Sequence, residues 1–268
     1  LTAQKKFQAI KWEVKDGRSG NFANSIIKDI YGFTWIGHQT GVDRFDGNHF
    51  ITYNGGGLGL VEDSLNNIWL GSADGLHRID IRADTASSIT SSRQLSGNRF
   101  VIPFWATSEA ILCVENGSKI TSYNIHTLAR KTLLDTFHVA HQDFYRYHFS
   151  ILDPGGKSVW ILEHGGVSEI LLSTGGKTHF PPPEFGKRQN AQLDAPGMCW
   201  DPIRKRIWIN STVGLLEFDP LGKKYNTSHA AYGLLQNPGY DVYPGISVAP
   251  DGRVWYAIGP PRGIQIYD

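Results

Sequence analysis

Residues 25–46, SIIKDIYGFTWIGHQTGVDRFD, carry the pattern that decides the fold. Residues 26–28 begin with the β-branched pair Ile26 and Ile27, and residues 33–37 and 42–45 are two further runs that contain apolar side chains. Turn-forming residues separate them, as at 29–32. Apolar runs bounded by turns every few positions predict three consecutive antiparallel strands, a β-meander.

The same pattern recurs along the chain. A second copy covers residues 59–80, and later copies cover 150–170, 199–219 and 246–268. In four copies a tryptophan is followed six residues later by glycine: Trp35, Trp69, Trp160 and Trp208. Residues 110–124 fit as a degenerate third copy with Leu112 in the tryptophan position. Positions 35, 69, 112, 160, 208 and 255 are then 34 to 48 residues apart, a repeat of propeller-blade size.

Residues 48–53 add a fourth strand to the first copy. The sequence therefore predicts an all-β protein, a β-propeller of four-stranded antiparallel blades with six repeats visible, in a single domain spanning 1–268. The sixth repeat ends after its third strand, and residues 7–14 form a lone strand that the sixth repeat lacks. Pairing the two would close a six-bladed ring. Alternatively, the chain is part of a seven-bladed ring.

Several recurrent residues have structural interpretations. The repeat tryptophans are expected in the core between blades. The aspartates at the first turn, Asp29, Asp63, Asp153 and Asp201, are expected to bond the backbone of their own turns. The glycine-rich residues 55–59 predict a connection between blades, and Cys113 and Cys199 predict two buried free thiols.

Composition and motifs exclude several classes of function. A net charge of +1 with 19% charged residues gives no basic footprint, so no nucleic-acid partner is expected. No apolar run approaches 18 residues, so no membrane contact is expected within this segment. Nucleophile-elbow, zinc-protease and paired-cysteine motifs are absent from the sequence. The chain is therefore expected to be no enzyme, with no cofactor and no metal site.

A ligand site is expected at one rim of the channel, where loops of all blades converge. Two sets of loops meet there, the connections entering each first strand and the turns between second and third strands. Aromatic faces and hydrogen-bonding side chains in these loops suit sugar rings, which makes an oligosaccharide the expected small-molecule ligand. The candidate ligand-binding residues are His38, Tyr145, Arg146, Tyr147, His148, Glu163, His164, Asp241, Tyr243 and Arg262.

The first repeat, SIIKDIYGFTWIGHQTGVDRFDGNHFITY, and the second, GLVEDSLNNIWLGSADGLHRID, resemble the two-component regulator propeller repeat. Such repeats build the extracytoplasmic sensor domain of hybrid two-component system sensor kinases of Bacteroides-type bacteria. The resemblance implies a periplasmic, non-catalytic propeller that senses glycan fragments, and it leaves a homodimer of the parent sensor open. The ligand residues of such sensors vary, so the resemblance assigns none here.

Two alternatives remain on the sequence alone. One is a protein-interaction propeller. The other is an enzyme, because residues 249–268 also resemble repeats of the streptogramin B lyases. A lyase would need a general base with a metal or an acid in one channel mouth, and Glu163 with His164 is the pair that could supply them.

Overall fold

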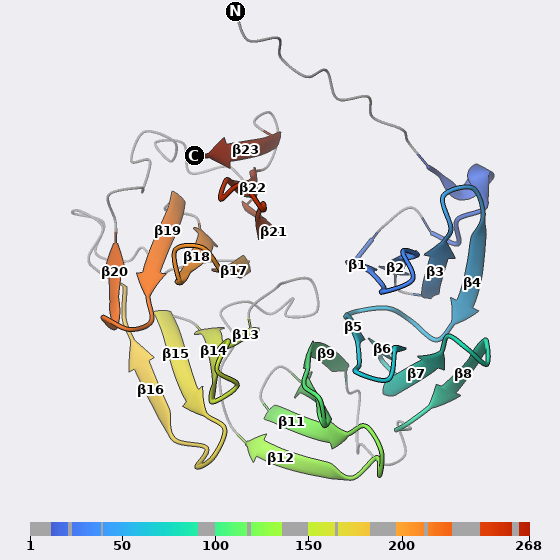
Figure 1. The fold of residues 1–268 in the computed structure, drawn as a ribbon, viewed down its shortest axis with the longest axis horizontal. Helices are drawn as coiled ribbons and strands as arrows, with labels where there is room; N and C mark the ends of the chain where they lie inside the picture. The colour runs from blue at the N-terminus through green and yellow to red at the C-terminus, as the bar shows by residue number, and fades with distance from the viewer. Residues whose placement is uncertain are drawn as a thin grey trace, which may run out of the picture.

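The computed structural model describes residues 12–20, 23–38, 40–90, 100–116, 119–135, 150–163, 166–182, 197–211, 214–226, 242–258 and 263–268. These residues form six small antiparallel sheets placed around a common centre (Figure 1). Each sheet is one blade, and its strands run in sequence order from the inside of the ring outward. The predicted six-repeat β-propeller is confirmed.

The strands of the first three blades follow the predicted repeats. Blade 1 contains β1 (Ser25–Lys28), β2 (Thr34–His38), β3 (Gly41–Phe45) and β4 (Phe50–Asn54). Blade 2 contains β5 (Leu60–Glu62), β6 (Asn67–Gly71), β7 (Leu76–Asp80) and β8 (Thr85–Ser88). Blade 3 contains β9 (Val101–Ala106), β10 (Ala110–Glu115), β11 (Lys119–Asn124) and β12 (Arg130–Leu134).

The remaining blades have the same construction, except that the last is one strand shorter. Blade 4 contains β13 (Ser150–Leu152), β14 (Ser158–Glu163), β15 (Gly166–Leu171) and β16 (Lys177–Phe180). Blade 5 contains β17 (Gly197–Asp201), β18 (Arg206–Ser211), β19 (Gly214–Asp219) and β20 (Lys224–Asn226). Blade 6 contains β21 (Val242–Val248), β22 (Val254–Ile258) and β23 (Gly263–Tyr267).

The strand register confirms the degenerate third repeat. Trp35 pairs with Arg44 across blade 1, and Leu112 pairs with Ser122 at the same place in blade 3. Leu112 is buried like the tryptophans it replaces. A branched aliphatic side chain therefore serves in this interface where the other blades use an indole ring.

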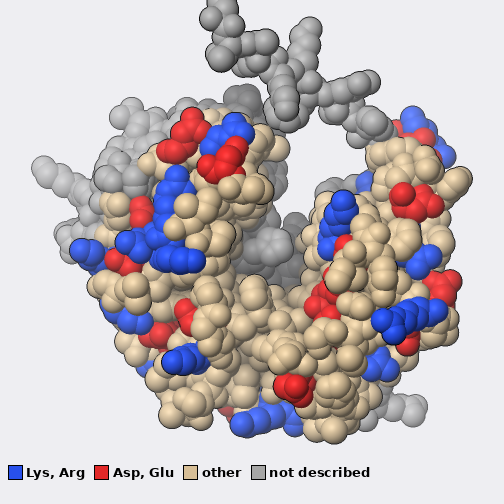
Figure 2. Space-filling model, viewed as in Figure 1, with Lys and Arg blue, Asp and Glu red and all other residues tan. Residues whose placement is uncertain are grey.

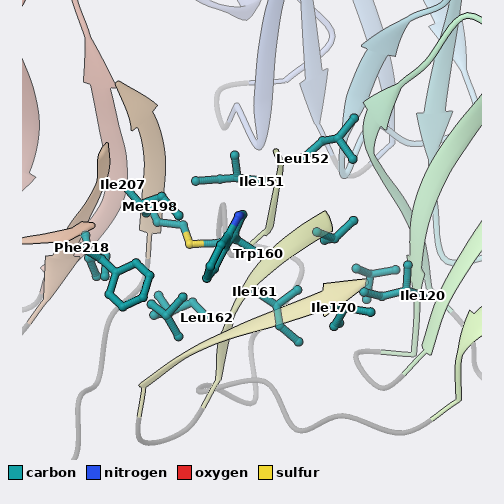
Figure 3. Packing of buried hydrophobic residues seen from close by; sticks show 14 of the residues in the cluster. Ile120, Ile151, Leu152, Trp160, Ile161, Leu162, Ile170, Met198, Ile207 and Phe218 are labelled. Carbon is teal, nitrogen blue, oxygen red and sulfur yellow. The ribbon is translucent and has the colours of Figure 1, made fainter. Parts of the chain in front are cut away.

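The core consists of the surfaces between blades. Trp35, Trp69, Trp160 and Trp208 are at most 2% exposed, which confirms that they are core residues. Trp35 packs with Leu60, Ile68 and Leu70 of the next blade, and Trp208 packs with Val254 and Tyr256 of blade 6. Trp160 points from β14 toward Met198 and Ile207 of blade 5 (Figure 3). Each tryptophan thus covers the face of the blade that follows it.

The first-turn aspartates do more than bond their own turns. Asp63 accepts the backbone N–H groups of Leu65 and Asn67 at 2.9 and 2.8 Å, and it also accepts the indole N–H of Trp69 at 2.6 Å. The same indole bond joins Asp29 to Trp35 at 2.7 Å and Asp201 to Trp208 at 2.9 Å. One carboxylate therefore fixes a turn and satisfies the only polar atom of a buried ring.

The connection between blades 1 and 2 is rich in glycine for a steric reason. A Cβ atom on Gly37 would lie 2.3 Å from the carbonyl oxygen of Gly57, and the N–H of Gly57 donates to the carbonyl of His38 at 2.7 Å. The two backbones cross in contact, so neither position has room for a side chain. This confirms the inter-blade interpretation of residues 55–59.

The ring is open between blades 6 and 1 (Figure 1), and the space-filling view shows the same opening on one face (Figure 2). Among the residues that the structure describes, β23 has no fourth strand beside it. The expected closure is wrong for residues 12–14, because Val14 begins a short 3-10 helix, η1 (Val14–Asp16), and Trp12 packs on blade 1. Residues 7–11 lie outside the described ranges.

Two further findings concern the chain as a whole. No helix within the described ranges is long and apolar enough to cross a membrane. Cys113 and Cys199 are both free, as expected; Cys113 is buried as predicted, whereas Cys199 is only partly buried. Burial raises the pKa of both thiols, that of Cys199 to about 12, so each is kept in the unreactive protonated form.

Replacing Trp69 with alanine is expected to cost about 3–5 kcal/mol of unfolding free energy, because it leaves a cavity between blades 2 and 3. The matched control is Trp255→Ala, since Trp255 holds the same repeat position in blade 6 but is only partly buried. Urea unfolding of both variants should show the larger loss for Trp69→Ala. Equal losses would mean that burial between blades is not what makes the tryptophan important.

Replacing Asp63 with alanine is expected to cost about 1–3 kcal/mol, because the buried indole N–H of Trp69 loses its acceptor. Asp153→Ala is the control. Asp153 bonds the N–H of Gly155 in its turn, but Trp160 has no partner for its indole nitrogen among the described residues. A loss in Asp153→Ala as large as in Asp63→Ala would contradict a separate contribution from the indole bond.

Candidate ligand-binding rim

Because neighbouring strands of each blade are antiparallel, the second strand ends, and the third begins, at the same end of the ring as the first strand begins. This end is called the hairpin rim below. The residue three places after the repeat tryptophan, or after Leu112, is the last of the second strand or, in blade 2, the residue directly after it, and so lies at this rim. It is polar and buried in five blades, as His38, Ser72, Glu115, Glu163 and Ser211.

In blade 3 this position holds a fully bonded carboxylate. Arg130 of β12 donates to the two oxygens of Glu115 at 2.9 and 2.6 Å, a bidentate pair. Tyr123 and Thr121 of β11 donate their hydroxyls to Oε1 at 2.6 and 3.0 Å. Burial alone raises the pKa of the Glu115 carboxyl, but the bonds from Arg130, Tyr123 and Thr121 outweigh it and lower the pKa below its ordinary value.

Blade 4 repeats this arrangement with different residues. Lys177 of β16 donates to Oε1 of Glu163 at 2.5 Å, and the hydroxyl of Ser168 donates to Oε2. His179 of β16 lies beside both, with Nδ1 at 2.9 Å from the Ser168 hydroxyl. In both blades a carboxylate on the second strand, a hydroxyl on the third and a cation on the fourth join the three strands.

In blade 1 the carboxylate is on the third strand instead of the second. His38 stands where the glutamates stand, and Asp43 of β3 stands where Thr121 and Ser168 stand. Asp43 accepts the backbone N–H of Ser19 at 3.0 Å and the hydroxyl of Thr52 at 2.8 Å. The Ser19 hydroxyl bridges Asp43 and Nε2 of His38. The cluster therefore fastens the segment before β1 onto the face of blade 1.

The blade 1 cluster and a similar group in blade 2 each contain serine, histidine and aspartate, but neither has the geometry of a catalytic triad. In a triad the serine and the aspartate bond opposite nitrogens of the imidazole. Ser19 and Asp43 both lie at Nε2 of His38. In blade 2, Ser72 and Asp74 both lie at Nε2 of His77, at 3.0 and 3.1 Å. These clusters bond strands and turns together.

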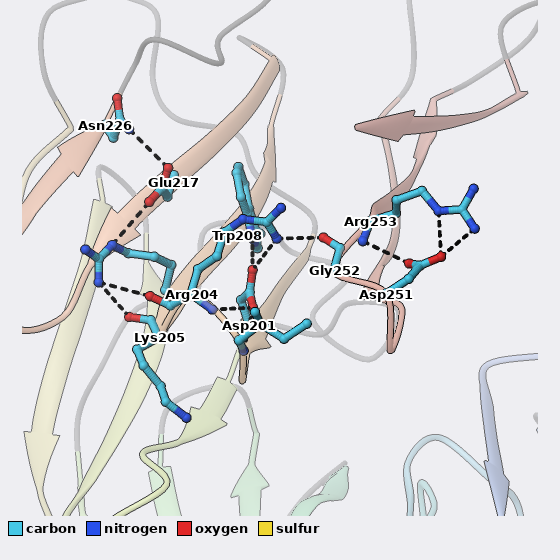
Figure 4. A network of polar contacts seen from close by, with 11 residues as sticks. Asp201, Arg204, Lys205, Trp208, Glu217, Asn226, Asp251, Gly252 and Arg253 are labelled. Atoms are coloured by element: carbon cyan, nitrogen blue, oxygen red, sulfur yellow. Dashed lines mark hydrogen bonds and ion pairs between the residues drawn. The ribbon is translucent and has the colours of Figure 1, made fainter. Parts of the chain in front are cut away.

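The opposite rim, formed by the turns after each first strand, carries a network that joins two blades (Figure 4). Arg204 donates to Asp201 at 3.0 Å within blade 5 and to the carbonyl of Gly252 in blade 6 at 2.6 Å. Asp251 and Arg253 form an exposed pair beside it, at 2.5 Å between the charged atoms. Among the described residues, Arg204 is the side chain that joins the two blades at this end.

Most of the predicted site residues cannot be placed. Tyr145, Arg146, Tyr147, His148, His164, Asp241 and Arg262 lie outside the described residues, and for Tyr243 only the backbone position in β21 is given. His38 and Glu163 do lie at the hairpin rim, in blades 1 and 4. Both are buried and bonded within their blades. Their contact with a ligand stays a prediction.

The sequence-based choice of rim residues missed the partners that make these clusters. Arg130, Lys177 and Ser19 hold the buried groups, yet none was a candidate. A signal for the first two was present in the repeat. Each lies on the fourth strand, fifteen and fourteen residues after its glutamate, so the spacing could have shown the pairs.

No family model matches the chain, and no curated protein matches it at a significant level. Solved structures do match. The extracellular domain of BT3049 from B. thetaiotaomicron, a protein assigned to a hybrid two-component system, superposes with a TM-score of 0.70 at 20% identity over 97% of this chain. The extracellular domain of BT4673, assigned in the same way, gives 0.70 at 16% identity over 94%.

The chain shares its fold with these two extracellular domains. The resemblance of the repeat to them is therefore confirmed in three dimensions. The chain spans 35% and 32% of the two sensor chains, about a third of their length. PorZ, a bacterial surface component of the type-IX secretion system of Porphyromonas gingivalis, matches less well, with a TM-score of 0.56 at 15% identity over 88% of this chain and 37% of its own.

The bonds of Glu115 predict a pH dependence. Because the pKa of Glu115 is lowered on folding, its contribution to stability is present above the ordinary value of 4.5 and is lost as the pH falls through the lowered value. Glu115→Gln should melt at a lower temperature than the parent at pH 7, and the two melting curves should converge in acid. The exposed Glu109→Gln is the control and should parallel the parent. A constant gap between Glu115→Gln and parent down to pH 3 would contradict this.

Proposed function

We propose that the chain is a non-catalytic, extracytoplasmic sensing propeller that binds a glycan fragment at the hairpin rim. The observation that carries the proposal is the fold it shares, over nearly its whole length, with extracellular domains assigned to hybrid two-component systems. In such a system the propeller binds a ligand outside the cytoplasm, and binding shifts the population of the parent protein toward its signalling state.

The electrostatics of the described rim favour binding over catalysis. A general acid or base must be free to exchange a proton with its substrate. Glu115 is held by Arg130, and Glu163 is held by Lys177 and Ser168. This bonding of Glu163 counts against the lyase alternative, for which Glu163 was one of the two candidate groups.

The connections that enter the first strands supply the ligand contacts in this proposal. The hairpin position is buried in five blades, so ligand-facing groups at this rim must come chiefly from elsewhere. Residues 145–148, Tyr-Arg-Tyr-His, precede β13 and combine aromatic faces with hydrogen-bond donors. Arg146 and Arg262 favour an anionic sugar, because guanidinium groups bind carboxylates in bidentate fashion.

Calorimetric titration with neutral and acidic oligosaccharides tests the proposal. At least one acidic oligosaccharide should bind the parent, and Arg146→Ala and Tyr147→Ala should each weaken it about tenfold or more, as expected for the loss of a charge-assisted bond or a stacked ring. Arg253→Ala, on the opposite rim, is the control and should bind like the parent. Binding unchanged in both rim variants would place the site elsewhere, and no binding by any sugar would refute the glycan class.

A further inference from the structure

The connection that leaves blade 1 begins with an asparagine followed by glycine, Asn54 and Gly55. The sequence contains two such Asn–Gly steps, the other beginning at Asn116. Asn54 is the last residue of β4 and pairs with Gly41, the first residue of β3, so it lies at the hairpin rim. Its side chain is exposed to solvent. An asparagine side chain reacts most readily with its own backbone in such a step, because glycine has no side chain to hinder the attack.

The reacting groups of the first step are free in the folded chain. The backbone N–H of Gly55 donates to no acceptor within the described ranges, and the side-chain amide of Asn54 has no partner there either. For the two groups to meet, Asn54 must turn out of the extended strand conformation. It is the end residue of the outermost strand of its blade, where local opening costs least. The structure therefore leaves this step accessible to reaction.

The second step is held more firmly. Asn116 follows β10 with a left-handed backbone, φ 55°, and its N–H donates to the carbonyl of Phe100 at 3.0 Å. Its side-chain oxygen is buried. A fixed turn conformation and a buried side chain both hinder attack on the side-chain carbonyl. The two Asn–Gly steps of the chain thus stand in contrasting environments.

The Asp–Gly steps, in which the same ring can form, are protected in other ways. They begin at Asp16, Asp46, Asp74 and Asp251. The N–H groups of Gly17 and Gly252, which would attack, donate to backbone carbonyls at 3.1 and 2.9 Å. Bonds from backbone N–H groups lower the pKa of Asp46. Burial raises the pKa of Asp74, but bonds from a serine hydroxyl and an imidazole outweigh it. Both carboxyl groups are thus kept ionised, and an ionised carboxylate resists attack.

We propose that Asn54 is a site of spontaneous deamidation in the folded chain. The backbone nitrogen of Gly55 loses its proton and attacks Cγ of Asn54. A C–N bond forms, and the side-chain nitrogen leaves with that proton as ammonia. The resulting succinimide takes up one water molecule, which breaks one of the two bonds between the ring nitrogen and its carbonyl carbons. Aspartate or isoaspartate is left at position 54, and no oxidant, reductant or enzyme is required.

The product places a new negative charge at the hairpin rim. The formal net charge of the chain falls from +1 to zero. A Cβ atom on Gly55 would lie 3.8 Å from the ring of His77, so the charge arises beside the cluster of Ser72 and His77 in blade 2. Isoaspartate also lengthens the main chain ahead of the tight crossing at Gly57. Weaker binding of an acidic ligand at this rim is a consequence that rests on the proposed function, whereas the modification itself does not.

Peptide mapping by mass spectrometry tests the proposal on the intact chain, incubated at physiological temperature and sampled over time. In the folded chain, conversion at Asn54 should be about tenfold faster or more than at Asn116, because only Asn54 is free to open. In urea, where structure holds neither step, the two should convert at similar rates. Conversion at Asn54 no faster than at Asn116 in the folded chain would overturn the proposal.

The products and the pH dependence test the mechanism. Both aspartate and isoaspartate should appear at position 54, and the rate should rise with pH, because the attacking nitrogen must lose its proton. Aspartate alone would indicate direct hydrolysis by water and would overturn the succinimide route.

Asn54→Gln is the matched variant, since glutamine must form a larger ring and reacts far more slowly. Ion-exchange chromatography of the aged parent should show an acidic species that Asn54→Gln lacks. An acidic species growing equally fast in both would place the new charge elsewhere and overturn the proposal. The mapping of the parent decides the matter by itself where the variant fails to fold.

Discussion

The packing of one large side chain against the following blade is the interaction on which the rest of this structure depends. A four-stranded sheet of this size has two apolar faces and cannot bury either by itself. The repeat tryptophan covers the face of the next blade, and its one polar atom is bonded to the turn aspartate in blades 1, 2 and 5. The tryptophan and the turn aspartate together therefore bury the blade surface, fix the turn and give the buried indole N–H an acceptor.

The polar clusters at the hairpin rim provide bonding partners for the polar side chains that are buried at the end of the second strand. The second strand must end where the ring meets solvent, and its last residue still lies between blades. Glutamate with arginine or lysine, or histidine with aspartate, keeps these groups bonded while joining three strands. A buried ion pair adds little net stability, but removing one partner leaves the other charge uncompensated. The clusters therefore join neighbouring strands and keep their buried polar groups bonded.

Much of the fold could be predicted from the sequence, because the repeat is dense in local signals. Tryptophan, glycine and turn aspartate recur at fixed offsets, and even the degenerate repeat with Leu112 was found from spacing. The ring closure was predicted wrongly for residues 12–14, because the apolar pattern of residues 7–14 does not show which part of the ring this segment contacts. Trp12 packs on the aromatic pair Phe45 and Phe50 of blade 1. This contact joins residues more than 30 positions apart in the sequence, and no repeating pattern predicts it.

The candidate site was predicted less well, for a physical reason. Residue types at a rim do not show whether a polar side chain faces solvent or a neighbouring blade. His38 and Glu163 look like ligand groups in sequence, yet their partners on other strands enclose them. The entry connections, where residues 145–148 lie, depart most from the repeat and so carry the least structural signal. The proposal of a sugar site therefore rests on the chemistry of these residues and not on their position.

Native-state hydrogen exchange of the intact chain tests most directly the claim that neighbouring blades stabilise one another. The backbone amides of β6, β14 and β18, whose blades have a neighbour on each side, should exchange slowest and near the rate set by global unfolding. The amides of β22 and β2, in the two blades that border the gap, should exchange faster through local opening. Equal protection in all these second strands would show that each blade is stable by itself and would contradict the claim.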